Sequence, residues 1–347
     1  MAWLEQFIRR YEHGRWTTDN NRKVFPFAWG LEHIGGRADE KDPRGFLREY
    51  SAQSVANSDA WYACEPAKDY RLEPIASGNG LGNYSQLTFA SAIESPWKEN
   101  NRVVARWYPA RHSGPAVIVL PNWNAKWPAM TPLCRWLNTL GISALRLSLP
   151  YHDARMVPGH ERADQLVGTN IGLTIQANRQ AVVDLRRCLR WLEQMGYSKL
   201  GLLGISIGSS ISFITMCHDR AVRAGAYLHV STYFGDVVRT GMTTMHVWEG
   251  LQSKVTPEEI REFWAPISPF PFIERVRGTG QRALMIMAKY DPTFSPELSE
   301  EILAELKRLG IPHDAFRVPC GHYSLGEPPF SWAVGGRLGA FLFRNLS

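Results

Sequence analysis

Along most of the chain, the spacing of hydrophobic residues alternates between a pattern typical of β-strands and a pattern typical of helices. Runs with the character of β-strands recur at 86–91, 101–110, 116–121, 142–150, 199–205, 224–231, 282–291 and 314–320. One of them, AVIVLP, is continuously apolar, which is typical of a strand buried on both faces. Stretches with apolar residues at helical spacing lie between the runs, at 130–140, 174–196, 208–218, 296–310 and 332–346. This alternation predicts an α/β fold with a mostly parallel, doubly wound sheet and helices on both faces.

Two segments depart from the alternation. Residues 1–85 are polar and interrupted by turn residues, including the loop-like ASGNGLGN at 76–83, and we expect an N-terminal extension packed on the core. Its first part, Met1–His13, has apolar residues at helical spacing and predicts a helix that packs on the main domain. The main domain at 86–347 contains one long connection, 232–281, with helical pieces. A connection of this length is typical of a lid or inserted cap.

Composition narrows the class of protein. The chain has 347 residues, 44% of them hydrophobic, and a net charge of +6 without a run of like charges, which argues against a nucleic-acid partner. Its five cysteines show no CxxC spacing, so we expect neither a zinc site nor a disulfide framework. Charged Glu5, Arg9 and Arg10 lie where a signal peptide needs apolar residues, and no apolar window is long enough for a transmembrane segment. We therefore expect a cytoplasmic protein.

The most informative short motif is KLGLLGISIGSSIS. It places Ser206 between Gly204 and Gly208, where a buried strand ends and a helix of small residues begins. A turn this tight strains the backbone of its central residue, and side chains two positions away would collide with neighbouring backbone. The hydroxyl would stand at a helix N-terminus, where negative charge is favoured. Taken alone, the motif also fits an ordinary glycine-rich turn between a strand and a helix.

A nucleophilic serine needs a base, and the base needs an orienting acid. Asp291, in KYDPTF, follows an apolar strand, and His322, in PCGHYS, follows the last strand. Because the carboxyl ends of parallel strands share one edge of a sheet, we expect both side chains to converge with Ser206. Asp236, which follows the preceding strand, is the alternative acid.

The order Ser206, Asp291, His322, with the GISIG turn and the two loops, resembles the α/β-hydrolase superfamily over residues 86–347. The GHYS loop and the SP segment before the acid strand resemble the branch that holds dienelactone hydrolases, acetyl esterases and prolyl-oligopeptidase-like proteins. The resemblance implies that Ser206 is the nucleophile and that His322 acts as general base and then general acid. It also implies that Asp291 orients the imidazole and stabilises its charged form.

The same resemblance implies an oxyanion hole made of two backbone N–H groups. Ile207, directly after the nucleophile, would supply one. The loop LPNWNAKW would supply the other, but Pro121 and Asn122 stand where the family often has a His-Gly pair. This departure leaves Trp123 and Asn124 as alternatives and indicates a bulky, aromatic-walled acyl pocket.

Other polar residues at strand ends have two interpretations. His152 and Asp153, in PYHDAR, follow another strand and would either contact substrate or form an Asp-Arg pair that fixes the loop. His229 is interpreted as a core histidine with its hydrogen bonds satisfied, and Cys320 as a packing thiol.

These observations predict a serine hydrolase that cleaves a carboxylic ester or thioester and needs no cofactor and no metal. We expect a small-molecule ester with an apolar moiety, because the lid is rich in aromatics: Trp248, Phe263, Trp264, Phe270 and Phe272. A homo-oligomer is compatible with the sequence. The alternatives are a prolyl-oligopeptidase-like peptidase, although 85 residues cannot build a propeller, a non-catalytic ligand-binding protein, and a lyase or perhydrolase. A dehalogenase would carry aspartate in place of Ser206.

Overall fold

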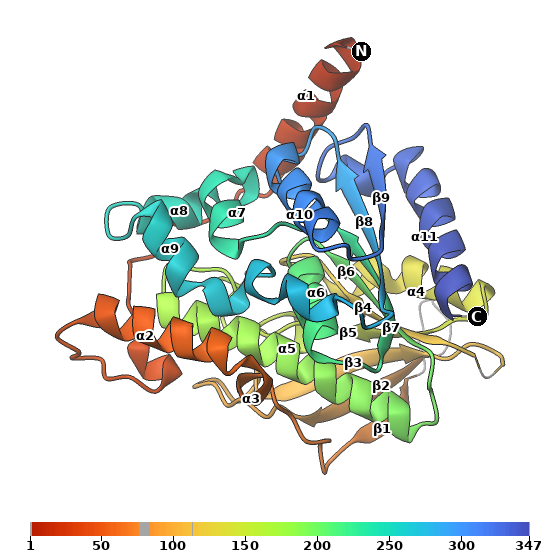
Figure 1. The fold of residues 1–347 in the computed structure, drawn as a ribbon, viewed down its shortest axis with the longest axis horizontal. Coiled ribbons are helices and arrows are strands. Elements are labelled where there is room, and N and C mark those ends of the chain that lie inside the picture. The colour runs from red at the N-terminus through yellow and green to blue at the C-terminus, as the bar shows by residue number, and fades with distance from the viewer. Residues whose placement is uncertain (1, 76–83, 113, 347) are drawn as a thin grey trace.

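The computed structural model describes residues 2–75, 84–112 and 114–346, so the loop expected at 76–83 lies outside the described residues. Within these ranges nine strands form one sheet in the order β1-β2-β3-β5-β4-β6-β7-β8-β9 (Figure 1). The strands are β1 (Arg71–Ile75), β2 (Tyr84–Ala90), β3 (Arg102–Tyr108), β4 (Ala116–Leu120), β5 (Ser143–Leu147), β6 (Leu200–Ile205), β7 (Val222–Leu228), β8 (Arg282–Ala288) and β9 (His313–Val318).

The sheet is mostly parallel, as the sequence predicts. The six neighbouring strands β5, β4, β6, β7, β8 and β9 run parallel to one another. The strands β1, β2 and β3 add an antiparallel part at the β5 side. Every residue of β4 and of β5 is buried, which agrees with helices covering both faces. Because six strands run parallel, their carboxyl ends lie along one edge, where the loops of interest gather.

The α-helices are α1 (Ala2–Thr18), α2 (Pro43–Ala56), α3 (Ser58–Trp61), α4 (Thr131–Thr139), α5 (Ile171–Gln194), α6 (Ile207–His218), α7 (Phe234–Thr240), α8 (Met245–Leu251), α9 (Pro257–Phe263), α10 (Pro296–Arg308) and α11 (Phe330–Leu346). The 3-10 turns used below are η3 (Asp153–Arg155), η5 (Ala265–Ile267), η6 (Phe270–Val276) and η7 (Ser324–Gly326). Helices alternate with the strands from β4 onwards, whereas α1, α2 and α3 precede the sheet and α7, α8 and α9 lie together between β7 and β8. Within the described ranges, none of the helices is both long and apolar enough to cross a membrane.

Two apolar cores lie on opposite faces of the sheet. Leu185 of α5 and Ile214 of α6 belong to the larger core, which also takes in Ile302 of α10. Leu137 of α4 and Leu342 of α11 belong to the second core. The sheet is therefore covered on both sides, and the fold is doubly wound. All five cysteines lie within the described ranges and carry free thiols.

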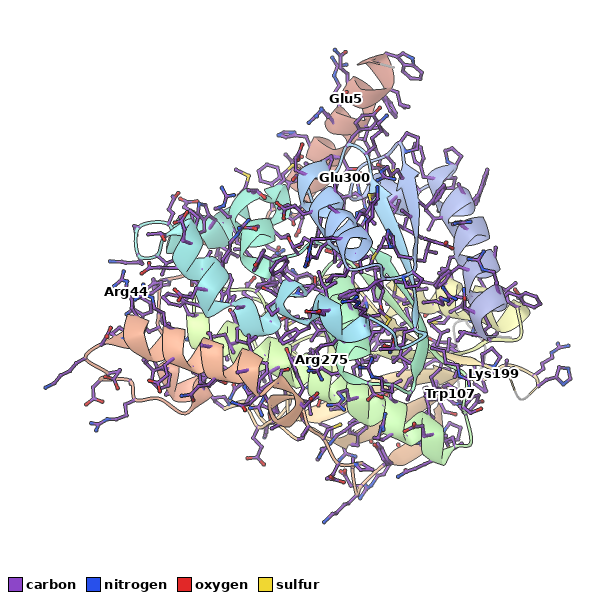
Figure 2. All side chains as sticks on the ribbon, in the orientation of Figure 1. Glu5, Arg44, Trp107, Lys199, Arg275 and Glu300 are labelled. Atoms are coloured by element: carbon purple, nitrogen blue, oxygen red, sulfur yellow. The ribbon has the colours of Figure 1, made fainter. Side chains whose placement is uncertain are left out.

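The segment 1–75 is tied to the insertion between β7 and β8. Ser51 of α2 donates a hydrogen bond to the backbone oxygen of Phe263 at 2.7 Å. Arg44, at the end of α2 that faces α9, pairs with Glu259 at 2.9 Å (Figure 2). The insertion is helical, as expected, and α2 holds it from outside. The first strand of the sheet, β1, also comes from the stretch that the sequence assigns to the extension.

Candidate active site

Ser206 occupies a strained turn between β6 and α6. Its backbone lies at φ 57° and ψ −123°, outside the regions that L-residues favour. A Cβ on Gly204 would lie 2.3 Å from the carbonyl oxygen of Gly208. A Cβ on Gly208 would lie 2.6 Å from the carbonyl oxygen of Pro121. Both glycines are therefore required for the turn, and Gly208 presses α6 against the loop that follows β4.

Asp291 stands just after β8 and is buried. Its Oδ1 accepts hydrogen bonds from the backbone N–H groups of Thr293 at 2.7 Å and Phe294 at 2.9 Å. Its Oδ2 accepts a hydrogen bond from Nδ1 of His322 at 3.0 Å. Burial by itself would raise the pKa of the carboxyl, but the two histidines beside it outweigh burial and hold the pKa well below its usual range. Asp291 is therefore an anion at neutral pH.

His322 lies in the loop after β9 and stacks in parallel on Phe294, with ring centroids 5.7 Å apart. Because Nδ1 faces Asp291, Nε2 lies on the other side of the ring, and within the described residues it has no hydrogen-bond partner. Burial would lower the pKa of the imidazole, but the charge of Asp291 and the hydrogen bond to it outweigh burial and raise the pKa. His322 is thus oriented and made more basic by the same carboxylate.

A cavity of about 760 Å³ opens at this edge of the sheet. It brings together five of the six residues predicted for the site, namely Ser206, Ile207, His322, Trp123 and Asn124. The sixth, Asp291, touches the ring of His322 and is buried. Sequence positions from 122 to 322 therefore meet at a single cavity.

The cavity wall is largely apolar, but its apolar residues are not the predicted ones. Among the described residues that line it are Met130, Leu133, Phe234, Val238, Phe294, Val334 and Leu338. The lining includes none of the aromatics named for the insertion, Trp248, Phe263, Trp264, Phe270 and Phe272. Phe263 and Trp264 are 0% exposed, because they pack into the larger core beneath α2 and α5. These two aromatics therefore pack to hold the insertion in place, and any apolar character of the site comes from other residues.

The two alternatives for the second oxyanion donor differ in what they already bind. The backbone N–H of Asn124 donates to Nε2 of His152 at 2.9 Å. Nδ1 of His152 faces the carbonyl oxygen of Pro150 at 2.8 Å, which leaves Nε2 as the acceptor. Burial lowers the pKa of His152 to about 4, so the ring stays neutral and keeps this role. In the described part of the chain, the N–H of Trp123 has no acceptor.

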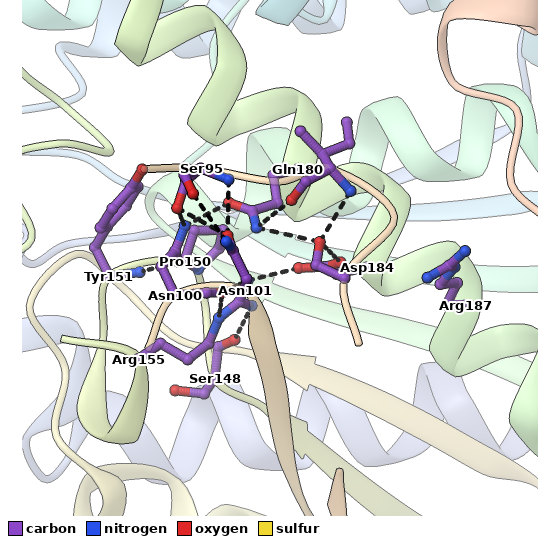
Figure 3. Close-up of polar contacts among 12 residues, drawn as sticks. Ser95, Asn100, Asn101, Ser148, Pro150, Tyr151, Arg155, Gln180, Asp184 and Arg187 are labelled. Carbon is purple, nitrogen blue, oxygen red and sulfur yellow. Dashed lines mark hydrogen bonds and ion pairs between the residues drawn. The ribbon is translucent and has the colours of Figure 1, made fainter. Parts of the chain in front are cut away.

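The loop that carries His152 is held by a buried polar network (Figure 3). Arg155 and Asp184 of α5 are both fully buried and pair at 2.8 Å. The same guanidinium donates to the carbonyl oxygens of Asn100 at 2.8 Å and Ser148 at 3.1 Å. These contacts tie the end of β5 to α5, so His152 is presented by a rigid loop.

The remaining candidates form structural ion pairs. Asp236, the alternative acid, pairs with Arg261 at 2.6 Å and does not contact His322. Asp153 pairs with Arg146 of β5 at 2.6 Å, and both side chains are buried. An Asp-Arg pair thus fixes the PYHDAR loop, while His152 holds the neighbouring loop and lies outside the cavity lining.

His229 is a site residue that sequence reasoning missed. Its Nδ1 lies 2.7 Å from Oδ2 of Asp291, an electrostatic contact without hydrogen-bond alignment, and its ring centroid lies 4.5 Å from that of His322. It also lines the cavity, so the interpretation as an ordinary core histidine is wrong. The available signal was its position directly after β7, at the same edge of the sheet.

The same three side chains are the group that comes nearest to a metal site. The ligand atoms of His229, Asp291 and His322 all lie within 4.8 Å of one another. However, both Nδ1 atoms already sit 2.7 and 3.0 Å from the same carboxylate oxygen. An ion bound between them at about 2.0 Å from each nitrogen would have to push these groups apart. The arrangement fits a carboxylate shared by two imidazoles better than an ion site.

Comparisons with solved structures bear on the fold, and comparisons of sequence do not. No protein-family model and no curated protein sequence matches the chain. Acetyl xylan esterase 1 from Thermoanaerobacterium sp. JW/SL YS485 is similar in structure, with a TM-score of 0.62 at 14% identity over 93% of this chain and 100% of that one. An α/β hydrolase from Penicillium sp. sh18 matches with a TM-score of 0.54 at 15% identity, over 76% of this chain and 99% of its own.

A peptidase is also similar. The acylaminoacyl peptidase of Pyrococcus horikoshii matches with a TM-score of 0.55 at 13% identity, over 81% of this chain and 42% of the peptidase. This chain therefore spans less than half of the peptidase's length. Together with the sheet order, these likenesses show that the chain has the α/β-hydrolase fold. The branch within the superfamily stays a prediction.

Proposed function

We propose that this chain is a serine hydrolase that cleaves a carboxylic ester or thioester through an acyl-enzyme. One observation carries the proposal. Ser206, held at φ 57° at the start of α6, opens on the same cavity as His322, whose Nδ1 is hydrogen-bonded to buried Asp291 at 3.0 Å. A hydroxyl, a base and an orienting acid in this arrangement support nucleophilic acyl transfer.

The two half-reactions use the same three residues. Oγ of Ser206 bonds to the acyl carbon while Nε2 of His322 takes the hydroxyl proton. The tetrahedral intermediate then breaks its bond to the alcohol or thiol, which leaves with that proton. Water attacks the acyl-enzyme with His322 again as base, and the acid is released as Ser206 regains its proton. Asp291 remains an anion throughout and stabilises the imidazolium.

Two backbone N–H groups would stabilise the developing oxyanion. Ile207 supplies one, since the first N–H groups of a helix have no intrahelical acceptor. Trp123 supplies the other, because its N–H has no acceptor in the described part of the chain, whereas that of Asn124 is bound to His152. The oxyanion hole is therefore assigned to Ile207 and Trp123.

The cavity supports a substrate with an apolar moiety. Its walls include Met130, Leu133, Val238 and Leu338, and burying an alkyl group against them is favourable by about 0.8 kcal/mol per methylene. Esters with medium acyl chains or aromatic acyl groups should therefore react faster than acetates. Equal rates across the series would contradict this part of the proposal.

The first test is labelling of the purified protein by a fluorophosphonate probe, read by intact mass, with Ser206→Ala as the control. One adduct that disappears in the variant is expected. An ester, thioester and amide panel then separates esterase from peptidase activity, and faster amide cleavage would favour the prolyl-oligopeptidase-like alternative. No adduct in either protein would overturn the proposal and favour a non-catalytic ligand-binding protein.

A further inference from the structure

The N-terminal helix α1 sends one carboxylate into the histidine loop. Glu12 is 1% exposed, although it lies on a helix whose outer half is largely open to solvent. Its Oε2 accepts the backbone N–H of Tyr323 at 2.8 Å, and its Oε1 accepts the backbone N–H of Ser324 at 2.9 Å. Oε1 also accepts the hydroxyl of Ser324 at 2.7 Å. All three donors come from the two residues that follow His322.

The same hydroxyl carries the network to the other side of the histidine. The backbone N–H of Gly321 donates to Oγ of Ser324 at 2.8 Å, and Oγ in turn donates to Glu12. A Cβ on Gly321 would lie 2.4 Å from the carboxyl carbon of Glu12. Glycine is therefore needed before His322 to let the carboxylate approach. The turn from Gly321 to Ser324 is closed around a single buried anion.

This arrangement differs from an ordinary surface contact of a helix. A buried carboxylate that satisfies two backbone N–H groups and a hydroxyl forms charge-assisted hydrogen bonds, which are stronger than neutral ones. Removing it would leave those donors buried without a partner.

We infer, on the basis of the proposed function, that Glu12 is a positioning residue for His322 and that α1 is a working part of the active site. The carboxylate sets the backbone on both sides of the histidine, which determines where Nε2 points relative to Ser206. Residues that follow Glu12 on the same segment, among them Arg15, Thr18 and Asp19, line the cavity itself. This N-terminal segment therefore lines part of the cavity and also holds the turn that carries His322.

Glu12 also acts on the histidine through its charge. It is one of the groups that raise the pKa of His322, after Asp291 has overcome the effect of burial. A purely structural brace would affect stability and rate but would leave the protonation of the base unchanged. This difference provides a readout that separates the two roles.

The test compares Glu12→Gln with Glu5→Gln in the full chain. Glu5 lies on the outer half of the same helix, where it pairs with exposed Arg9 and, among the described residues, with no other cation (Figure 2). The rate of fluorophosphonate labelling at Ser206 is measured against pH. For Glu12→Gln we expect the plateau rate to fall roughly tenfold or more, since small misplacements of a catalytic group are costly. The midpoint should move to lower pH, and Glu5→Gln should match the wild type.

Glu12→Asp separates charge from reach. It keeps the anion but shortens the side chain, so we expect a midpoint near that of the wild type and a reduced plateau. If Glu12→Gln does not fold, the reduced plateau of Glu12→Asp carries the test. An unchanged rate and midpoint in Glu12→Gln, or a lower melting temperature with no shift of the midpoint, would overturn the inference.

The inference and the proposed function fail in different ways. If the wild type does not label, the proposed function fails, and the pKa of His322 is then followed by NMR in histidine-labelled protein, which needs no turnover. A lower pKa in Glu12→Gln than in Glu5→Gln would still support the role of Glu12. Equal values would overturn it.

Discussion

Nε2 of His152 accepts the backbone N–H of Asn124 at 2.9 Å, so a side chain after β5 holds the peptide that follows Trp123. The loop after β4 and the loop after β5 are thereby locked together at the edge of the cavity. Asn124 adopts φ 60°, a conformation that this hydrogen bond helps to maintain. The contact ties the N–H of Asn124 to the scaffold, which is why we propose the N–H of Trp123 as the second oxyanion donor.

Replacing His152 by phenylalanine should therefore reduce catalysis without abolishing the fold. The loop would lose its acceptor, and the N–H of Trp123 would no longer be held at the oxyanion position. We expect kcat to fall by about 10²-fold, the cost of one lost oxyanion donor, with a smaller change in KM. Steady-state kinetics on an ester substrate measures both. His313→Phe is the control, because His313 lies at the amino end of β9, away from the carboxyl ends that carry the site. Equal kinetics in the two variants would contradict the assignment.

The pH dependence should follow the protonation of His322. The base must be neutral to accept a proton, and its pKa is raised above 6.5 because Asp291 outweighs burial. The value of kcat/KM should therefore rise with pH through a midpoint above 6.5. In Asp291→Asn the raising charge is lost, so the midpoint should move to lower pH and the plateau should fall by roughly 10⁴-fold. A pH–rate profile of both proteins decides this, and an unmoved midpoint would count against Asp291 as the partner.

Gly208→Ala tests the close approach of α6 to the loop after β4. The added Cβ would lie 2.6 Å from the carbonyl oxygen of Pro121, so the backbone must shift. We expect the free energy of unfolding to fall by about 1–3 kcal/mol and labelling of Ser206 to be lost. Gly336→Ala, at an exposed position of α11, is the matched control, because nothing lies within 4 Å of the Cβ that it would add. That change should stabilise the protein by about 0.5–1 kcal/mol in urea unfolding.

Asp184→Ala tests the buried network below His152. The change leaves the guanidinium of Arg155 buried without its anion, so we expect the free energy of unfolding to fall by about 3–5 kcal/mol. Asp39→Ala removes the partner of Arg37 in a pair whose side chains are 71% and 77% exposed, and should change stability by less than about 0.5 kcal/mol. Denaturant unfolding compares the two. Similar losses in both variants would show that the network adds little.

The sequence predicted those parts of the site that each strand end carries by itself. Ser206, Asp291 and His322 each follow an apolar run, and in a parallel sheet such ends share an edge. These three residues could be recognised from their sequence neighbours, because glycines, a proline and other turn residues surround them. The topology of the sheet brings them together, and the alternation of strand-like and helix-like segments along the sequence predicts that topology.

Other parts depend on contacts that no local pattern records. The strand β1 has four exposed residues followed by one that is partly buried, so it shows no alternation by which to find it. Phe263 was among the aromatics that led us to expect an apolar substrate, but α2 covers the insertion from outside and Ser51 of α2 binds the backbone of Phe263. A lid aromatic and a core aromatic look the same in sequence. Their difference lies in which helix packs over them.

The link between Glu12 and the backbone of Ser324 joins residues 312 positions apart. Because a ribosome makes the chain from the N-terminus, α1 emerges early, and its buried carboxylate has no partner until the turn after β9 has been synthesised. The turn around His322 can therefore take this geometry only after all nine strands of the described sheet have been synthesised. A nascent chain stopped short of Ser324 would carry Ser206 and Asp291 but no braced histidine loop, so the acyl transfer that we propose would have to wait until this stretch has been made.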